Sequence, residues 1–525
     1  MKNRILILSI MALLAAGTLP AQQISTLYFL ENAPMRHRIN PAFQPVSNIY
    51  VGITPLSYTY FSVGNNALTM KDLIYKKNGQ YVTALYPGES SRLEKRLKRG
   101  LGFFADMDLN LLNFGFRLKD YGYVHFAVTE RLQNAEVLPS DLHKLLYTDN
   151  PATEGRTINL KDLSSTTSLY TEIAAGYSHK INDQWTVGGK LKFLLGTAYA
   201  ELKMTDATIG MYPDRLSANI NGHLRASLPI FKNLPDLMKY EQLQSIGDYI
   251  GIDNLGSLLK PSGIGLAFDV GATYKPLPML QISVSATDLG FIHWNDNADY
   301  SFHADSVYTG PTIMFSDIEL VENREQTDIA RLVSDTLVTF FSDLAQKQLH
   351  GTRNSGNGFT RALHGQLHIA ADANFLDNKI GVGLYSCTTF RGKKVYEEIT
   401  LGASVRPVNW FNFALSYSFV NGKWSSLGAG LSIMTYDGIN LTLMSDYVPM
   451  RYATLATSGG QNITVPSSTK QFNLALGITI VVGTNPKKAK GAKQENDQRQ
   501  EKPENAPEQA TEDNKEEKQD ETPAA

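Results

Sequence analysis

The chain has 525 residues, a formal net charge of −2 at pH 7 and a single cysteine, Cys387. A charge this close to zero does not favour nucleic-acid binding. One cysteine excludes an internal disulfide and a zinc site built from several cysteines. Beyond residue 21, no stretch approaches the length of about 18 apolar residues that a membrane-spanning helix needs. A helical membrane protein is therefore excluded, which leaves soluble domains or a large β-barrel.

The first residues have the three-part layout of a secretory signal. Lys2 and Arg4 precede an apolar run over 5–14, and a small, turn-prone segment ends at Ala21. We expect cleavage after Ala21, so that 1–21 is a signal peptide. The alternative is a membrane anchor, for which the apolar run is short.

The dominant period of the body is two, which is typical of strands with one apolar and one polar or small face. A soluble β-sandwich would show the same alternation. Strands of roughly 9–15 residues, and short polar turns that alternate with long connections, favour a transmembrane barrel instead. The last predicted strand illustrates the pattern, with an apolar face of Phe472, Leu474, Leu476, Ile478, Ile480 and Val482.

We therefore predict an all-β, antiparallel transmembrane β-barrel of about 14 strands, within a range of 12–16. Residues 22–47 would form an N-terminal plug, 48–484 the barrel and 485–525 a tail. The hairpin at 199–226 either belongs to the wall or projects from it. Apolar residues near helical spacing predict helical insertions in loops at 236–259 and 328–349. An even strand number places both termini in the periplasm.

The C-terminal tail differs in kind from the body. From Lys487 to Ala525 there are 8 Lys or Arg, 11 Asp or Glu and no aromatic residue. Such a segment buries too little apolar surface to offset its ordering entropy, so we expect a disordered, charged tail. It either contacts a periplasmic partner or is simply solvated.

Three tryptophans follow predicted turns at 182–183, 407–409 and 421–422. Trp185, Trp410 and Trp424 fit an aromatic girdle at a membrane–water interface. The alternative is ordinary packing at the edge of a sandwich.

Charged residues inside predicted strands should face the lumen, because a charge facing lipid is costly. Lys190, Lys192, Asp269 and Asp288 are the candidates. The two carboxylates either bind a polar group of a substrate or, as we favour, pair with the lysines.

Catalytic and cofactor signatures are absent from the sequence. His364 and His368 would be about 13 Å apart on one strand, too far to share a metal. Neither a nucleophile-elbow motif nor a phosphate-binding loop occurs. We expect no enzyme activity, no cofactor and no metal site.

Two segments carry a resemblance to known proteins. Asn40-Pro41-Ala42 precedes the first predicted strand, and a glycine-rich strand at 263–274 is followed by Asp288-Leu289-Gly290. This resembles the FadL-type barrels and the related PorV and PorP/SprF barrels of Bacteroidetes, with the helical insertions and tail as departures. The resemblance implies an N-terminal hatch, whose candidate residues are Asn32, Pro34, Asn40, Pro41 and Phe43.

The resemblance implies a location in the outer membrane, in contact with its lipid, and passage or binding of a small hydrophobic molecule. The alternative is a non-transporting platform for type IX secretion, gliding or envelope assembly, with periplasmic or exported proteins bound through loops and tail. A structural barrel without a transported substrate is the third possibility. None of these three hypotheses involves nucleic-acid binding.

Overall fold

The computed structural model describes residues 24–483 apart from 142–155, 228–260, 310–348 and short gaps at 78–79, 85–90, 99, 213–214, 296–297, 355–357, 392–393, 421–422, 436–437, 449–451, 457–461 and 467–469. The predicted signal peptide, the tail and the loop helix at 236–259 lie outside these residues. So does the loop helix at 328–349, except for Leu349, which begins a strand. Among the described residues, no helix combines the length and the apolar character needed to cross a membrane.

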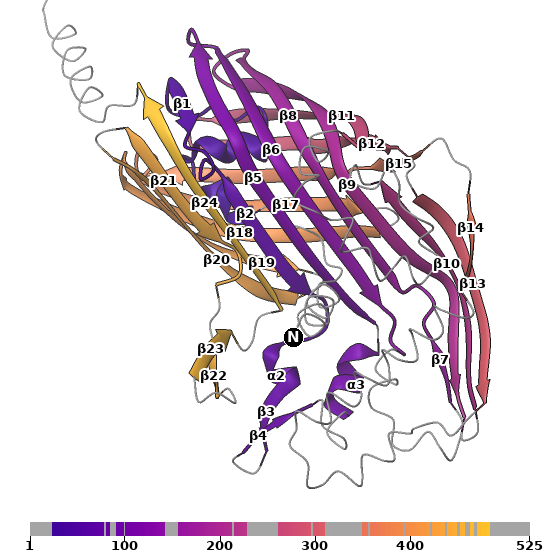
Figure 1. Ribbon diagram of the computed structural model, residues 1–525. Helices are drawn as coiled ribbons and strands as arrows, with labels where there is room; N and C mark the ends of the chain where they lie inside the picture. The colour runs from indigo at the N-terminus through magenta and orange to yellow at the C-terminus, as the bar shows by residue number, and fades with distance from the viewer. Residues whose placement is uncertain are drawn as a thin grey trace, which may run out of the picture. The chain divides into compact units, whose positions relative to one another are not determined.

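In the described part of the chain, fourteen antiparallel strands close into one wall, which confirms the predicted barrel (Figure 1). The wall closes where its last strand, β24, pairs with β1 and β2. Because β1 and β2 both lie between β24 and β5, they are counted together as one strand of the wall. The wall strands in order are β1 (Ile49–Gly52) with β2 (Thr59–Asn65), β5 (Leu101–Leu118), β6 (Gly122–Leu138), β8 (Ser164–Lys180), β9 (Trp185–Met211), β11 (Gly263–Leu277), β12 (Leu280–Trp294), β16 (Gln366–Phe375), β17 (Ile380–Arg391), β18 (Lys394–Val408), β19 (Phe411–Val420), β20 (Lys423–Met434), β21 (Ile439–Ser445) and β24 (Gln471–Val482).

The two ends of the wall differ. Connections of two to four residues join β5 to β6, β8 to β9, β11 to β12, β16 to β17, β18 to β19 and β20 to β21. These connections share one end, here called the turn end, with the start of β1 and the end of β24. The opposite end, the loop end, carries the long connections, together with two-residue connections from β17 to β18 and from β19 to β20.

The outer face of the wall is apolar over a limited height. On β9 the exposed large apolar side chains run from Trp185 to Phe193. Nine residues at about 3.3 Å each span roughly 30 Å along a tilted strand, which suits an apolar band about 25 Å tall. Beyond Phe193, no described residue of β9 is an exposed large hydrophobic.

The outer half of β9 leaves the wall. Its first half pairs with β11, from Trp185 to Gly196, and its second half pairs with β10. The hairpin at 199–226 therefore projects from the wall at the loop end. The projecting sheet, here called the extension, also contains β7 (Arg156–Asn159), β10 (Arg215–Ser227), β13 (Ala298–Thr309) and β14 (Leu349–Arg353), as Figure 1 shows.

The remaining described elements are short. The segment before β1 contains two 3-10 helices, η1 (Ser25–Phe29) and η2 (Pro34–Arg38), and the short strand β15 (Phe359–Ala362) precedes β16. A lobe between β2 and β5 holds α2 (Met70–Leu73), β3 (Ile74–Lys77), β4 (Gln80–Thr83) and α3 (Ser91–Leu97). A separate hairpin, β22 (Tyr452–Ala456) with β23 (Asn462–Pro466), connects β21 to β24.

Candidate functional site: a plugged lumen with an aromatic pocket

The N-terminal segment fills the lumen at the turn end (Figure 1). Its described part, residues 24–47, is here called the hatch. Ile24, Leu27, Tyr28 and Leu30 are at most 1% exposed and form one apolar core with wall residues such as Tyr385. An apolar segment this well buried contributes to the free energy of folding in the same way as a globular core.

The start of η1 is held by a carboxylate. The backbone N–H groups of Ser25 and Thr26 donate to the Asp446 carboxylate, at 2.8 and 2.9 Å. At the turn end, Arg406 forms an ion pair with Glu31 of the hatch. These polar contacts fix the hatch to strands that lie far from it in sequence.

The side chain of Asn40 attaches the hatch to the wall through a set of contacts here called the Asn40 seat. Its side-chain oxygen accepts the N–H of Ala42 at 2.9 Å, which closes a tight turn around Pro41. Its amide nitrogen is 3.2 Å from each of the carbonyl oxygens of Ala272 and Val284, a cross-strand pair of β11 and β12.

A glycine of the wall makes room for this turn. A Cβ atom on Gly271 would lie 2.1 Å from the side-chain oxygen of Asn40, so no larger residue fits while the hatch is docked. The Asn-Pro pair that stands out in the sequence is thus the part of the hatch that approaches the wall backbone most closely in this region.

The other predicted hatch residues lie at the turn end. Asn32 donates to the carbonyl of Asn409 at 2.9 Å, and Pro34 occupies the first turn of η2. Phe43 is buried, with the Arg36 guanidinium 4.2 Å from its ring centroid.

A closed set of charges, here called the ion cluster, crosses the lumen beside the hatch. Lys192 is 2.8 Å from Asp269, and Lys190 is 3.3 Å from the same carboxylate. Four cations face four carboxylates, so the cluster is neutral. Its members are Arg38, Arg131, Lys190, Lys192, Asp108, Glu172, Asp269 and Asp288.

The four charged residues predicted for the lumen all belong to the ion cluster, in contact with one another. Asp269 and Lys190 are direct cross-strand neighbours on β11 and β9. Sequence reasoning missed Arg38, Arg131, Asp108 and Glu172. Asp108, Arg131 and Glu172 lie on strands whose alternation is visible in the sequence, but the register that joins them is not. Arg38 belongs to η2 of the hatch.

A pocket of about 170 Å³ lies on the loop side of the ion cluster, and sequence reasoning missed it. Aromatic and polar side chains both line it. The Tyr199 ring lies 5.2 Å from that of Trp294, and Arg361 donates to the Tyr199 hydroxyl at 3.0 Å. The other lining residues include Tyr170, Ile292, Leu363, His364, Arg391, Gln133 and Asn134.

A β-bulge determines that Trp294 reaches this aromatic pocket. Thr287 and Asp288 of β12 together lie opposite Asp269 of β11. Asp288 has a left-handed backbone, with φ at 57°, and its N–H donates to the Asp269 carboxylate at 2.8 Å. The extra residue reverses the alternation, so Val284 faces outward before the bulge and Trp294 faces the lumen after it.

The wall is interrupted beside the aromatic pocket. β12 pairs first with β16 and then with β15, and residues 363–365 between those two strands are not in a strand. His364 lies in this break, so the prediction that it shares a strand with His368 is wrong. Nε of Arg391 is 3.3 Å from Nδ1 of His364, whereas His368 contacts Thr287 and Tyr385.

A second, polar cavity of about 390 Å³ opens at the turn end, between the hatch and β9, β11 and β12. Phe43, Gln44, Thr273 and Lys275 are among the residues that line it. The Asn40 seat and the ion cluster separate it from the aromatic pocket.

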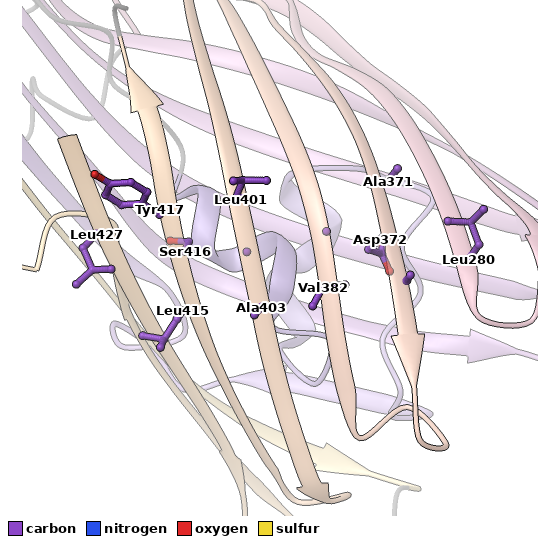
Figure 2. A pocket seen from close by; sticks show the side chains of 13 residues that line it. Leu280, Ala371, Asp372, Val382, Leu401, Ala403, Leu415, Ser416, Tyr417 and Leu427 are labelled. Carbon is purple, nitrogen blue, oxygen red and sulfur yellow. The ribbon is translucent and has the colours of Figure 1, made fainter. Parts of the chain in front are cut away.

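A further hollow, of about 530 Å³, is an open groove on the outer face of β16–β20 (Figure 2). Small side chains such as Ala371 and Ala403 form its floor between larger ones such as Leu401 and Tyr417. Because these side chains belong to the outward, apolar face, the groove is part of the apolar outer surface rather than of the lumen.

The predicted girdle tryptophans take different positions. Trp185 and Trp410 are exposed on the outer face beside turns of the turn end, and Trp185 stacks on Tyr274 at 4.5 Å. Trp424 belongs to β20, opposite Phe419 of β19. Among the described residues, no group of three or more His, Cys, Asp or Glu side chains could hold a metal ion.

The fold and the lumen define a β-barrel closed by its own N-terminal hatch. The chain belongs to the family described as a family of unknown function, DUF5723, which it matches over residues 41–446. No curated protein matches it.

Several solved barrels are similar in fold. The toluene transporter TbuX of Ralstonia pickettii is 10% identical, with a TM-score of 0.35, over 86% of this chain and 94% of that one. A FadL homologue of Pseudomonas aeruginosa is 11% identical, with a TM-score of 0.37, over 89% of this chain and 100% of that one. The translocator domain of the autotransporter NalP from Neisseria meningitidis is 8% identical, with a TM-score of 0.25, over 82% and 88% of the two chains. The assignment of a barrel rests on the strand pairing of this chain itself.

Proposed function

We propose that this chain is an outer-membrane barrel that binds a small hydrophobic molecule and admits it through the hatch, with both chain termini in the periplasm. The apolar outer band supports the membrane location, because a water-facing surface seldom exposes so many large apolar side chains. The turn end faces the periplasm in this orientation, as short connections do in barrels of this kind.

The aromatic pocket carries the proposal. Tyr170, Tyr199 and Trp294 are almost fully buried and line a hollow on the loop side of the ion cluster. Arg361 and Arg391 line the same hollow, so a ligand there would meet both apolar rings and polar groups. This combination suits a small hydrophobic or amphipathic molecule.

The hatch gives the site a closed resting state. A ligand in the aromatic pocket is separated from the turn-end cavity by the ion cluster and the Asn40 seat, so admission requires the hatch to move. The wall break at 363–365 borders the pocket through Leu363 and His364, which supports a lateral opening of the wall at this point.

The test is binding of a fluorescent apolar probe, N-phenylnaphthylamine, to the purified barrel. Trp294→Ala removes a pocket ring and should weaken binding about tenfold, the scale of one lost aromatic contact. Trp185→Ala, on the outer face, is the matched control and should bind normally. Equal binding by both variants and the unmodified chain would refute the pocket as the ligand site.

The membrane location is tested separately. The protein should be recovered in outer membranes and run faster on a gel before boiling than after it, as folded barrels do. Recovery as a soluble species without that shift would refute the barrel's membrane role.

The extension favours a second candidate function, a platform for protein partners. The second half of β9 adds about 40 Å of strand beyond the apolar band, far more than a membrane crossing needs. Leu202 of β9 and Leu224 of β10 are cross-strand neighbours, on the outer side of Tyr199. A variant in which an Asn-Gly turn replaces residues 203–223 therefore shortens the extension and keeps every pocket residue. It should keep probe binding if the extension serves partners, and should lose a secretion or assembly function.

A further inference from the structure

The lobe between β2 and β5, within residues 66–100, has a buried core of its own among its described residues and lies at the loop end. Ala67, Leu68, Ala84, Leu93 and Leu97 form its buried core. A backbone hydrogen bond of 2.7 Å from Ala84 to Leu73 ties the β3–β4 hairpin to α2. Side chains on its outer side are therefore carried by a folded scaffold.

This lobe is strongly basic. Residues 66–100 contain eight Lys or Arg and three Asp or Glu, a net charge of +5 in a chain whose net charge is −2. Leu93 and Leu97 turn one side of α3 into the lobe core, and Lys95 and Lys98 are exposed, as is Lys71 of α2. In the part of the chain that the structure describes, these three lysines have no ion-pair partner.

The basic lobe stands directly above the apolar band. Phe61 of β2 faces outward, is 43% exposed and is paired with Met107 and Leu474 on either side. It lies four residues before the end of β2 at Asn65, about 13 Å along the strand. A lipid whose acyl chains lie against the apolar wall would have its headgroup at the height of these lysines. The positive charge of the lysines favours a headgroup that is anionic.

We infer that the basic lobe binds the phosphate groups of the phosphorylated glycolipid in the outer leaflet. The inference rests on the proposed function, since it requires the loop end to face outward. A lysine near an anionic membrane surface contributes favourable binding free energy that falls off within a Debye length, so the lobe has to lie at the rim, as it does.

The experiment measures binding of lipid A in detergent micelles to the purified full-length barrel. Lys95→Gln combined with Lys98→Gln should weaken binding about thirtyfold, which corresponds to about 1 kcal/mol for each lysine. Lys95→Arg with Lys98→Arg keeps the charge and should bind normally. Lys119→Gln with Lys379→Gln removes two exposed lysines from the turn end and is the matched control.

The outcomes separate the possible occupants of the lobe. Lipid A without phosphate should bind weakly, and added salt should weaken the phosphorylated form. Equal binding of phosphorylated and dephosphorylated lipid A would overturn the inference. So would binding of inorganic phosphate as tight as that of the lipid, which would indicate a simple phosphate site, or tighter binding of an acidic peptide of residues 485–525.

The orientation is tested with Lys95→Cys on intact cells, labelled by a membrane-impermeant maleimide. The native Cys387 is buried, so background labelling should be low. Labelling of intact cells confirms the outward loop end and leaves lipid binding to decide the inference. Labelling only after the outer membrane is permeabilised would overturn the proposed orientation, and the inference with it.

Discussion

Replacing Lys192 by methionine is the sharpest test of how the lumen is held closed. The substitution keeps a long unbranched side chain and removes one positive charge from the neutral ion cluster. The Lys192 ammonium lies within 4 Å of three carboxylates, those of Glu172, Asp269 and Asp288. The variant would therefore leave four carboxylates facing three cations in a buried site.

The magnitude follows from burial. The Lys192 side chain is 2% exposed, and removal of one member of a buried ion pair costs about 3–5 kcal/mol because the remaining charge is uncompensated. That is a large fraction of the roughly 5–15 kcal/mol that stabilises a folded domain. Asp288→Asn added to the variant restores neutrality, and asparagine tolerates the left-handed backbone of this position. The double variant should recover a large part of the loss.

The assay is equilibrium unfolding in urea, followed by the loss of the fast-running gel form and by tryptophan fluorescence. The single variant should lower the unfolding midpoint strongly, and the double variant should lie between it and the unmodified chain. A single variant that loses less than about 1 kcal/mol, or a double variant that loses the sum of the two separate changes, would refute the reasoning.

Three further predictions concern the hatch. Gly271→Val would push a side chain into Asn40 and loosen the hatch, so cells should admit more vancomycin; Gly189→Val is the control, because a Cβ there meets its nearest atom only at 3.7 Å. Asp446→Ala leaves the buried N–H groups at the start of η1 without their acceptor, and should lower stability by about 1–3 kcal/mol in the same urea assay, whereas Asp446→Asn should lose less. Burial, followed by His125 and Lys190, holds the pKa of His37 well below its usual 6.5. Its protonation in the unfolded hatch therefore destabilises docking as the pH falls below about 6.5, and protease cleavage of the hatch should rise at pH 5, an increase that His37→Gln should remove.

The period of two was enough to predict the wall. Alternation along 472–482 reappears as outward Leu474, Ile480 and Val482 between buried residues of β24. Turn residues marked the short connections, because their chemistry is local. The number of strands was predicted by counting such segments, and only the position of the hairpin at 199–226 was left undecided. The hairpin shows the same alternation whether it pairs inside the wall or beyond it. Which strands it pairs with is decided by residues distant in sequence, and the alternation does not report them.

The aromatic pocket could not be predicted for a related reason. Without the bulge at Asp288, the alternation that places Val284 outward would place Trp294 outward too, among the lipid-facing residues. One residue with a left-handed backbone reverses that assignment, and nothing in the apolar pattern marks it. Four of the eight members of the ion cluster were predicted. The alternation of a strand shows which face each charged residue lies on, but it does not show which residues on neighbouring strands lie opposite one another.

The position of the hatch has a consequence for how the protein is assembled in time. η1 lies near the start of the chain, yet it packs against β17 to β21, and Ser25 is bonded to a residue 421 positions later. Contacts of such long range form late, because most of the chain has to be ordered first. A segment synthesised early is thus among the last to find its place, and its docking marks the moment at which the wall around it is complete.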